Sequence, residues 1–132
     1  MILVDSSVWI DFFNGRKSKE TDYLDSLLGV EQIVIGDLIL MEVLQGFRLD
    51  ADYEQAKNLL LNFTVHEMFG ISRALRAAEC YRTLRKKGVT VRRSNDMIIG
   101  AYCIDASIPL LFSDRDFSFM TEHLGLVQAL PN

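Results

Sequence analysis

The sequence predicts an α/β fold, in which a central, mainly parallel sheet of about four to five strands is flanked by helices. Two observations lead to this fold class. Short apolar runs alternate with longer segments of helical periodicity, and no repeat, linker or low-complexity stretch breaks the alternation. A chain of 132 residues with 49% hydrophobic residues can form one substantial core, so we expect a single domain over residues 1–132.

Strands are predicted where a short, continuous apolar run has the length of a buried strand. Four runs meet this description, and a fifth is a weaker candidate because it is more polar. The predicted strands are Ile2–Val4, Gln32–Ile35, Leu110–Phe112 and Leu126–Ala129, with Thr64–His66 as the weaker candidate.

Helices are predicted where apolar residues recur every three or four positions. The predicted helical segments are residues 23–28, 38–44, 51–61, 71–87 and 94–106. The longest is 71–87, whose apolar face is expected to include Ile71, Leu75 and Leu84, and Gly88 is expected to end it.

Two further expectations concern how helices are held in place. Either Ser94 or Asn95 is expected to cap the helix that runs to residue 106, because both residue types accept hydrogen bonds from free backbone N–H groups. Trp9, Phe12 and Phe13 are expected to pack a first helix onto the sheet.

The chain carries no sign of export or of membrane insertion. Its first residues form an apolar strand rather than a basic leader, and no apolar run approaches the roughly 18 residues of a membrane span. We therefore expect a cytoplasmic protein with no membrane partner. Cys80 and Cys103 lack a C-x-x-C pairing, so both are interpreted as small buried hydrophobes rather than as redox or zinc residues.

Four acidic residues follow apolar strand-like runs or lie on apolar helices: Asp5, Glu42, Asp96 and Asp114. An unpaired buried carboxylate costs several kcal/mol, so a shared cation would explain their joint placement. Because ligands of parallel sheets bind at the carboxyl ends of strands, Asp5 and Asp114 are expected at one sheet edge. Hard divalent cations prefer oxygen ligands, which predicts Mg²⁺ or Mn²⁺ and the hydrolysis of phosphodiesters.

Each acidic residue also has an ordinary structural explanation. Asp96 stands in the first turn of a helix, where the helix dipole favours an acid by ~0.3–1 kcal/mol. Glu42 either points toward a ligand or lies on a polar seam beside Gln45. Asp116 is either a fifth metal ligand or the cap of the segment that starts at Phe117, whereas Asp37 is interpreted as a plain helix cap.

The net charge of −4 conceals a strong asymmetry along the chain. Residues 73–93 contain eight basic residues and one acidic residue, a local charge of +7, so the remainder carries −11. A basic stretch beside an acidic cluster suits a metal nuclease, because cations bind the phosphate backbone while carboxylates bind the metal. The alternative is an ordinary solvated helix face.

Two other classes of phosphate chemistry lack their motifs. A haloacid-dehalogenase-type phosphatase requires a second Asp two residues after the first, but position 7 is Ser. A nucleotide-binding domain requires a glycine-rich phosphate loop, and neither G-x-G-x-x-G nor G-x-x-x-x-G-K-[ST] occurs.

Four blocks of the sequence carry a more specific signal. They are VDSSVWIDFF at 4–13, MEVLQG at 41–46, NDMIIGA at 95–101 and LFSDRDF at 111–117. In this order they resemble the PIN-domain family, specifically VapC-type toxins, and they span nearly the whole chain. Ser6 and Ser113 stand where this family often has Thr, and Met41 replaces a smaller residue, but no carboxylate is missing.

The resemblance implies a Mg²⁺- or Mn²⁺-dependent endoribonuclease, the toxin of a type II toxin–antitoxin system. Its catalytic quartet maps onto Asp5, Glu42, Asp96 and Asp114, with Asp116 as a further candidate ligand. In this mechanism one or two ions bound by the three aspartates polarise the phosphoryl oxygen and activate a water, and Glu42 completes the ligand set or orients that water.

The residues around this quartet receive supporting roles. Ser6 and Ser113 are expected to hold ligand carboxylates by hydrogen bonds, or else to serve in a local turn or helix cap. Some of five basic residues in the positive stretch are expected to bind the RNA backbone: Arg82, Arg85, Lys86, Arg92 and Arg93.

The resemblance also implies partners. These are an RNA substrate, a VapB-type antitoxin, a second copy of the chain in a homodimer, and a toxin–antitoxin hetero-oligomer that contacts DNA only through the antitoxin. The alternative hypothesis is a non-catalytic, dimeric PIN-like module that acts with a DNA-binding partner in regulation, its carboxylates binding the partner's arginines.

Overall fold

The centre of the molecule is a parallel sheet of four strands in the order β3-β2-β1-β4. The computed structural model describes residues 1–132. Its strands are β1 (Ile2–Val4), β2 (Ile33–Gly36), β3 (Thr64–His66) and β4 (Leu110–Leu111). The predicted fold class is therefore confirmed, and the weaker strand candidate is a strand of the sheet.

The last predicted strand, residues 126–129, is wrong as an element. It forms a single parallel bridge, in which Leu110 donates to the Val127 carbonyl and accepts from the Ala129 amide, both at 2.9 Å. Because β4 is only two residues long, it offers no ladder along which a further strand could extend. Val127 is exposed, so this edge segment also lacks the burial that fixes a strand.

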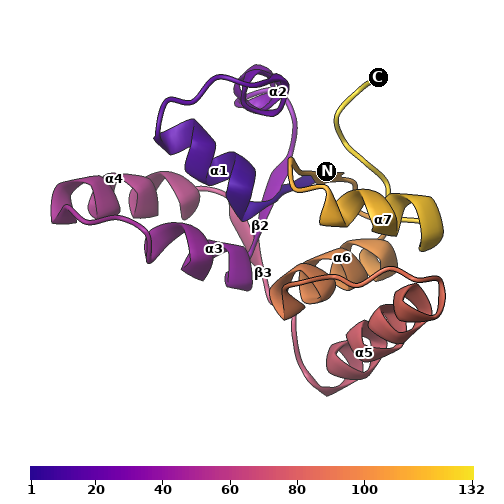
Figure 1. The fold of residues 1–132 in the computed structure, drawn as a ribbon. Helices are drawn as coiled ribbons and strands as arrows, with labels where there is room; N and C mark the ends of the chain where they lie inside the picture. The colour runs from indigo at the N-terminus through magenta and orange to yellow at the C-terminus, as the bar shows by residue number, and fades with distance from the viewer.

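Seven helices cover the sheet in two groups. The group on one side contains α1 (Ser6–Phe13), α2 (Lys19–Leu27), α3 (Asp37–Leu44) and α4 (Asp50–Leu60). The group on the other side contains α5 (Ile71–Lys86), α6 (Ser94–Ala106) and α7 (Asp116–His123). Figure 1 shows the sheet between these groups, and contacts within each group join α1 to α2 and α3, and α6 to α5 and α7.

Helix α5 confirms the predicted longest helix, but its buried face differs from the predicted one. Leu84 is buried as expected, whereas Ile71 and Leu75 are exposed. The residues that face the core are Ala77, Cys80 and Leu84. The helical spacing of apolar residues therefore predicted the helix correctly but did not identify its buried face, because two of the three buried residues, Ala77 and Cys80, are small.

Helix α6 lies between the sheet and the outer helices and is buried over most of its circumference. Its sequence is apolar on nearly all faces, as expected for a helix with neighbours on several sides. At Gly100 the missing side chain lets Met120 of α7 pack directly against the α6 backbone. The predicted cap is wrong: Arg93 precedes the helix, and no side chain of Ser94 or Asn95 accepts a capping hydrogen bond.

The aromatic side chains of α1 confirm that this helix packs into the core. Trp9 is fully buried and lies 5.9 Å from the rings of Phe12 and Phe13, measured between ring centroids. Cys80 and Cys103 are both free and buried, as predicted. None of the seven helices combines the length and apolar character that a membrane span requires.

Candidate metal centre

Two of the predicted carboxylates lie at the carboxyl edge of the sheet because their strands are in register. Asp5 directly follows β1, and Asp114 follows β4. Val4 is paired with Leu111, and the Asp5 amide donates to the Leu111 carbonyl at 2.9 Å. Parallel pairing therefore brings the two acidic residues to the same edge of the sheet, although 109 positions separate them in the sequence.

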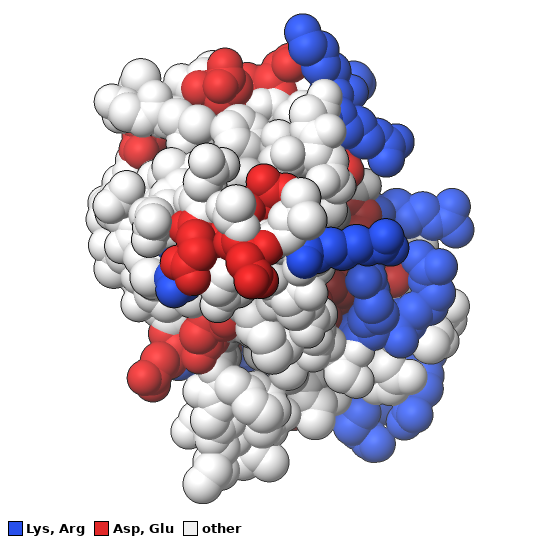
Figure 2. Space-filling model, turned by 90° about the vertical axis from the view of Figure 1, so that its left-hand side faces the viewer, with Lys and Arg blue, Asp and Glu red and all other residues white.

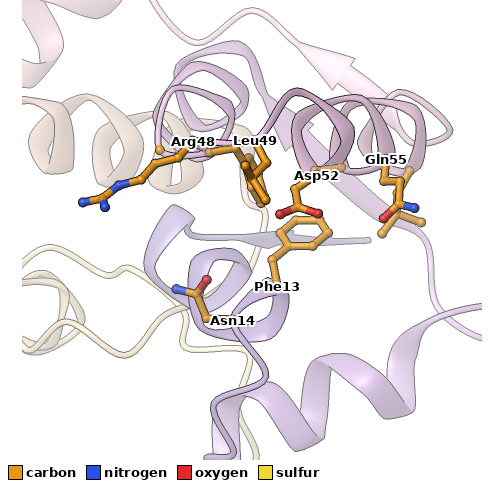
Figure 3. A pocket seen from close by; sticks show the side chains of 10 residues that line it. Phe13, Asn14, Arg48, Leu49, Asp52 and Gln55 are labelled. Atoms are coloured by element: carbon orange, nitrogen blue, oxygen red, sulfur yellow. The ribbon is translucent and has the colours of Figure 1, made fainter.

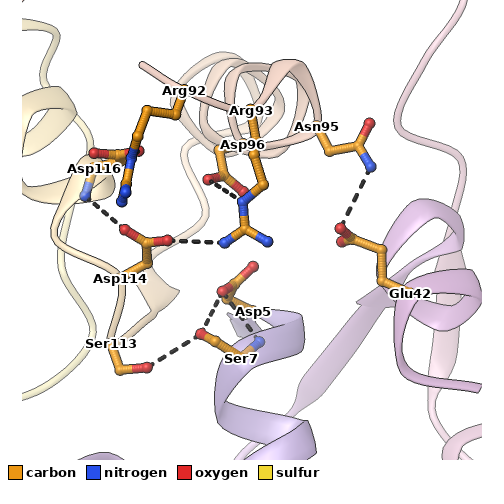
Figure 4. Close-up of polar contacts among 10 residues, drawn as sticks. All are labelled: Asp5, Ser7, Glu42, Arg92, Arg93, Asn95, Asp96, Ser113, Asp114 and Asp116. Carbon is orange, nitrogen blue, oxygen red and sulfur yellow. Dashed lines mark hydrogen bonds and ion pairs between the residues drawn. The ribbon is translucent and has the colours of Figure 1, made fainter. Parts of the chain in front are cut away.

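Asp5 both caps a helix and faces the site. Its Oδ2 accepts hydrogen bonds from the Ser7 amide at 3.2 Å and from the Ser7 hydroxyl at 2.6 Å. Its Oδ1 is buried and has no hydrogen-bond partner. The capping function thus occupies one oxygen and leaves the other directed toward the neighbouring carboxylates (Figure 4).

Glu42 points from α3 toward α6 rather than along a polar seam of its own helix (Figure 4). The Asn95 side-chain amide donates to Glu42 Oε2 at 3.4 Å, while Oε1 is buried without a hydrogen-bond partner. Asn95 was one of two candidates, with Ser94, for the cap of α6. Its position next to Asp96, at the start of α6, instead makes it a support for an acidic side chain of another helix.

Asp96, Asp114 and Asp116 converge on one point, with one carboxylate oxygen of each lying within 4.8 Å of the others. Asp96 and Asp116 are buried, each in the first turn of its helix. The Asp116 amide donates to Asp114 Oδ1 at 2.9 Å, and the Asp116 carboxylate makes no capping hydrogen bond. Of its two predicted roles, Asp116 therefore has the geometry of a ligand rather than that of a cap.

Two arginines from the connection between α5 and α6 contact these carboxylates. Arg93 Nη2 donates to Asp114 Oδ2 at 2.9 Å, and its Nε lies 3.6 Å from Asp96 Oδ2. Arg92 Nε lies 3.5 Å from Asp116 Oδ2. Both residues were expected to bind RNA; in the structure Arg92 lies against Asp116, and the Arg93 guanidinium lies between Asp96, Asp114 and Asp5 (Figure 4).

Burial and mutual repulsion change the pKa values of the acidic groups. The pKa of Asp96 is raised to about 7, first by burial and then by the negative charge of Asp5. Burial likewise raises the pKa of Asp5, although the hydrogen bonds from Ser7 oppose the shift. Burial also acts to raise the pKa of Asp114, but hydrogen bonds from the Asp116 amide and Arg93 outweigh it, and this pKa is lowered.

The acidic cluster fits a hard divalent cation. Three buried carboxylate oxygens from three different elements lack hydrogen bonds: Asp5 Oδ1, Glu42 Oε1 and Asp96 Oδ2. Buried polar atoms without partners are costly in folded proteins, and a cation bound in the cluster would offset that cost. The carboxylates close enough to share one ion are those of Asp96, Asp114 and Asp116, whereas Asp5 and Glu42 lie outside this group. The converging ligand atoms are carboxylate oxygens alone, which suits Mg²⁺ or Mn²⁺ rather than zinc.

The profile of the PIN domain family matches residues 2–121, which is nearly the whole chain and includes all five acidic residues of the site. The chain belongs to the PIN-domain family. The membership predicted from four sequence blocks is therefore confirmed.

Curated relatives of this PIN domain carry VapC names. A VapC ribonuclease of Mycobacterium bovis and ribonuclease VapC11 of Mycobacterium tuberculosis are each 31% identical to it over 134 aligned positions, covering 98% of both chains. The resemblance to VapC-type proteins thus extends over the full length of the chain.

Solved structures share the fold at lower sequence identity. VapBC2 from Rickettsia felis, bound to a DNA fragment from its promoter, has a TM-score of 0.75 at 15% identity, covering 97% of both chains. A toxin–antitoxin complex from Klebsiella pneumoniae has a TM-score of 0.73 at 18% identity, with the same coverage. VapC20 from Mycobacterium tuberculosis, a sarcin–ricin-loop-cleaving toxin, has a TM-score of 0.72 at 18% identity, covering 99% of this chain and 100% of its own.

The hydroxyl that supports Asp5 belongs to Ser7, not to Ser6. Both serines follow Asp5. A capping Asp accepts a hydrogen bond from the backbone N–H two positions later, which is that of Ser7, so the sequence itself could have identified Ser7. Ser113 bonds the Ser7 hydroxyl at 3.2 Å rather than a carboxylate. The two residues therefore form a short chain of hydroxyls that leads to Asp5 (Figure 4).

A cleft of about 470 Å³ opens beside the acidic cluster. It is lined by Asp114, by hydroxyls and by three arginines, Arg16, Arg92 and Arg93. Arg16 was not singled out by the sequence, because it stands outside the basic stretch and follows α1. The cleft combines cations and hydrogen-bond donors next to carboxylates, a lining that suits a phosphate-bearing ligand.

The remaining predicted RNA contacts lie on a separate surface. Arg82 and Arg85 line a groove of about 430 Å³ between α5 and α6, and the Arg85 guanidinium lies over the Tyr81 ring at 5.6 Å. Lys86 is exposed at the end of the same helix. In Figure 2 basic side chains gather along one edge of the molecule, with acidic groups visible between them.

A larger cleft of about 690 Å³ lies away from the acidic cluster, between the end of α1 and the start of α4. Figure 3 shows the Phe13 ring directed from α1 toward Asp52 on α4. Asp52 is the one acidic residue among its lining, so this cleft lacks the grouped carboxylates that metal chemistry requires.

Replacing Asp96 by Asn should change how stability depends on pH. In the folded, metal-free protein Asp96 keeps a proton up to about pH 7, whereas in the unfolded chain it loses that proton near pH 4. Between these values the folded state binds more protons, so its free energy of unfolding falls as pH rises from about 4 to about 7, and is then constant. At pH 8, in the presence of a chelator, the free energy of unfolding of Asp96→Asn should exceed that of the wild type by about 1–3 kcal/mol. Near pH 4 the two free energies should differ little.

Thermal unfolding measured from pH 4 to 8 checks this expectation, with the exposed residue Asp25 changed to Asn as the control. The control removes the same charge without relieving repulsion inside the cluster. An Asp96→Asn protein that is less stable than the wild type at pH 8 would contradict the assigned pKa and its cause.

Proposed function

We propose that this PIN domain is a Mg²⁺- or Mn²⁺-dependent endoribonuclease, the toxin of a type II toxin–antitoxin system. One observation carries the proposal: three of the acidic side chains around one site, those of Asp5, Glu42 and Asp96, each have a buried carboxylate oxygen without a hydrogen-bond partner (Figure 4). The relatives of 31% identity that are named ribonucleases support RNA as the substrate.

In this proposal Asp5, Asp96 and Asp114 hold one or two ions, with Glu42 and Asp116 as further ligands. A divalent ion bound there supplies Lewis-acid polarisation of the phosphoryl oxygen and lowers the pKa of a bound water. Glu42, held by Asn95, either completes the ligand set or orients the attacking water. Deprotonated Asp96 is the form that binds a cation, so its pKa of about 7 makes the site receptive at neutral pH and above.

The neighbouring residues position these groups. Ser7 fixes the rotamer of Asp5 through two hydrogen bonds, and Ser113 fixes Ser7 in turn. Arg92 and Arg93 lie where the phosphate backbone would enter the acidic cluster, while the basic residues of α5 would hold RNA farther from the scissile bond.

A VapB-type antitoxin is the proposed protein partner. Solved neighbours of the same fold include toxin–antitoxin complexes that cover 97% of this chain, one of them bound to promoter DNA. For this chain a homodimer, a toxin–antitoxin hetero-oligomer and indirect DNA binding through the antitoxin are parts of the proposal. Measuring the oligomeric state of this chain, first by itself and then mixed with a VapB-type protein, tests these parts of the proposal.

A second candidate function is a non-catalytic, dimeric PIN-like module acting with a DNA-binding partner. It is favoured by the observation that a guanidinium already fits the cluster, since Arg93 contacts both Asp114 and Asp96. A partner's arginine would find the same geometry. Cleavage assays distinguish the two functions, because only the nuclease produces discrete RNA fragments.

Asp5→Asn and Asp96→Asn should each abolish cleavage of RNA while keeping the fold. Each substitution preserves volume but removes a charge that binds the cation, and loss of a metal ligand is expected to lower the rate by about a hundredfold or more. Purified total RNA is incubated with and without Mn²⁺, and the products are mapped by end sequencing.

Asp25→Asn is the matched control and should cleave like the wild type, since Asp25 is exposed on α2, outside the acidic cluster. A folded Asp96→Asn protein with wild-type activity would remove this residue from the site. Intact RNA under every metal condition, with the wild type folded, would favour the non-catalytic module.

Replacing Arg85 and Lys86 together by Ala should weaken RNA binding and flatten its dependence on salt. Each lost contact to a single-stranded phosphate backbone lowers the slope of log K against log salt by about 0.7, so the pair should lower it by roughly 1.4. Filter binding of RNA to Asp96→Asn protein, which should not cleave, gives the slope. The double variant Arg48→Ala, Lys57→Ala removes the same charge outside the basic stretch, and an equal effect of both pairs would exclude a specific contact.

A further inference from the structure

Arg93 occupies the centre of the acidic cluster. In Figure 4 its guanidinium lies between Asp96, Asp114 and Asp5, at the place toward which the carboxylates converge. Its contacts are to Oδ2 of Asp114 at 2.9 Å and to Oδ2 of Asp96 at 3.6 Å. These two residues also belong to the group whose oxygens approach closely enough to share a metal ion.

The same oxygen atoms therefore have two candidate cations. Asp96 Oδ2 has no hydrogen bond, and its nearest positive group is Arg93. Asp114 Oδ1 already accepts from the Asp116 amide, which leaves Oδ2 as the oxygen that Arg93 takes. A guanidinium and a divalent ion on these atoms would repel each other at short range, so simultaneous occupation is unfavourable.

Arg93 is also well placed to leave. It lies on the connection before α6 rather than inside a helix, and 64% of its side chain is exposed. The side chains it contacts are fixed, since that of Asp96 is 6% exposed and that of Asp114 is 15% exposed. Side-chain rotation of a long, exposed arginine is rapid compared with the opening of a folded core.

The neighbouring cleft provides a destination for the guanidinium. Arg93 lines it together with Arg16 and Arg92, and the hydroxyls of Ser7 and Ser113 face the same space. Apart from Arg93, this lining carries the guanidinium groups of Arg16 and Arg92. The Arg16 side chain is 75% exposed, and its Nη1 lies 3.9 Å from Asp11 Oδ1. A phosphate oxygen in the cleft would be a partner for Arg93 once its carboxylates are taken.

We propose that Arg93 couples metal binding to phosphodiester binding: the guanidinium and a divalent ion are alternative partners of Asp96 and Asp114, and metal binding frees Arg93 for a phosphate in the adjacent cleft. The inference rests on the proposed metal site and adds to it a regulatory property. By linkage, a phosphodiester that draws Arg93 into the cleft must strengthen metal binding by the same factor.

The first test measures Mn²⁺ binding by isothermal titration calorimetry at pH 7.5, with no RNA present. Arg93→Gln should bind Mn²⁺ at least about fivefold more tightly than the wild type, because the competing guanidinium is gone. Arg16→Gln removes the same charge from the same cleft without touching the carboxylates, and should stay within about twofold of the wild type. Thermal unfolding confirms that each variant is folded.

The second test repeats the titration with a 2′-O-methyl RNA oligonucleotide, which lacks the free 2′-hydroxyl but keeps the phosphodiester backbone. In the wild type the oligonucleotide should increase Mn²⁺ affinity, and Mn²⁺ should increase oligonucleotide affinity by an equal factor. In Arg93→Gln this factor should fall by at least about threefold, whereas in Arg16→Gln the factor should be retained.

The outcomes separate this inference from the proposed function. If Arg93→Gln binds Mn²⁺ no more tightly than Arg16→Gln, the competition is overturned, while Mn²⁺ binding that Asp96→Asn loses would leave the metal site in place. If the wild type binds no Mn²⁺, both the metal site and the coupling are overturned. Tighter binding confined to Arg93→Gln, together with its smaller coupling factor, supports the inference.

Discussion

Several carboxylates lie together where water is largely excluded, which costs free energy, and the contacts around the site offset that cost. Asp5 and Asp96 are both buried, and burial is the main reason that their pKa values are raised. The negative charge of Glu42 adds to the shift of Asp5, and that of Asp5 adds to the shift of Asp96. Each hydrogen bond around the site offsets part of this cost. Ser7 donates to Asp5, Asn95 donates to Glu42, and the Asp116 amide donates to Asp114. The buried oxygens that remain without hydrogen bonds, on Asp5, Glu42 and Asp96, leave part of this cost for a cation to offset.

The fold brings these groups together by strand register and by one central helix. Parallel pairing of β1 with β4 aligns the residues that follow them, and β2 leads directly into the helix that carries Glu42. Helix α6 starts at this same edge, so its first turn adds Asp96 and its supporting amide. A sheet of two- to four-residue strands is sufficient because only the strand ends need to be fixed.

Features that depend on local chemistry were predictable from the sequence. Apolar runs predicted three of the four strands, a weaker and more polar candidate proved to be the fourth, and carboxylates after apolar runs predicted the acidic cluster. What required the structure was side-chain direction. The second serine after Asp5, rather than the first, supports it, and Asn95 contacts a distant helix instead of capping its own. The basic stretch predicted cations near phosphate, but charge counting could not show that Arg93 contacts Asp114 and Asp96.

The proposed metal centre requires that oxygens of Asp5, Asp96 and Asp114 bind a divalent cation. The most direct measurement is anomalous diffraction at the manganese edge, from crystals grown with MnCl₂. We expect an anomalous peak among these three carboxylates, within about 2.0–2.6 Å of their oxygens, with Arg93 displaced toward the cleft of Arg16 and Arg92. A well-ordered acidic cluster with no anomalous peak and with Arg93 still bound to Asp114 would contradict it.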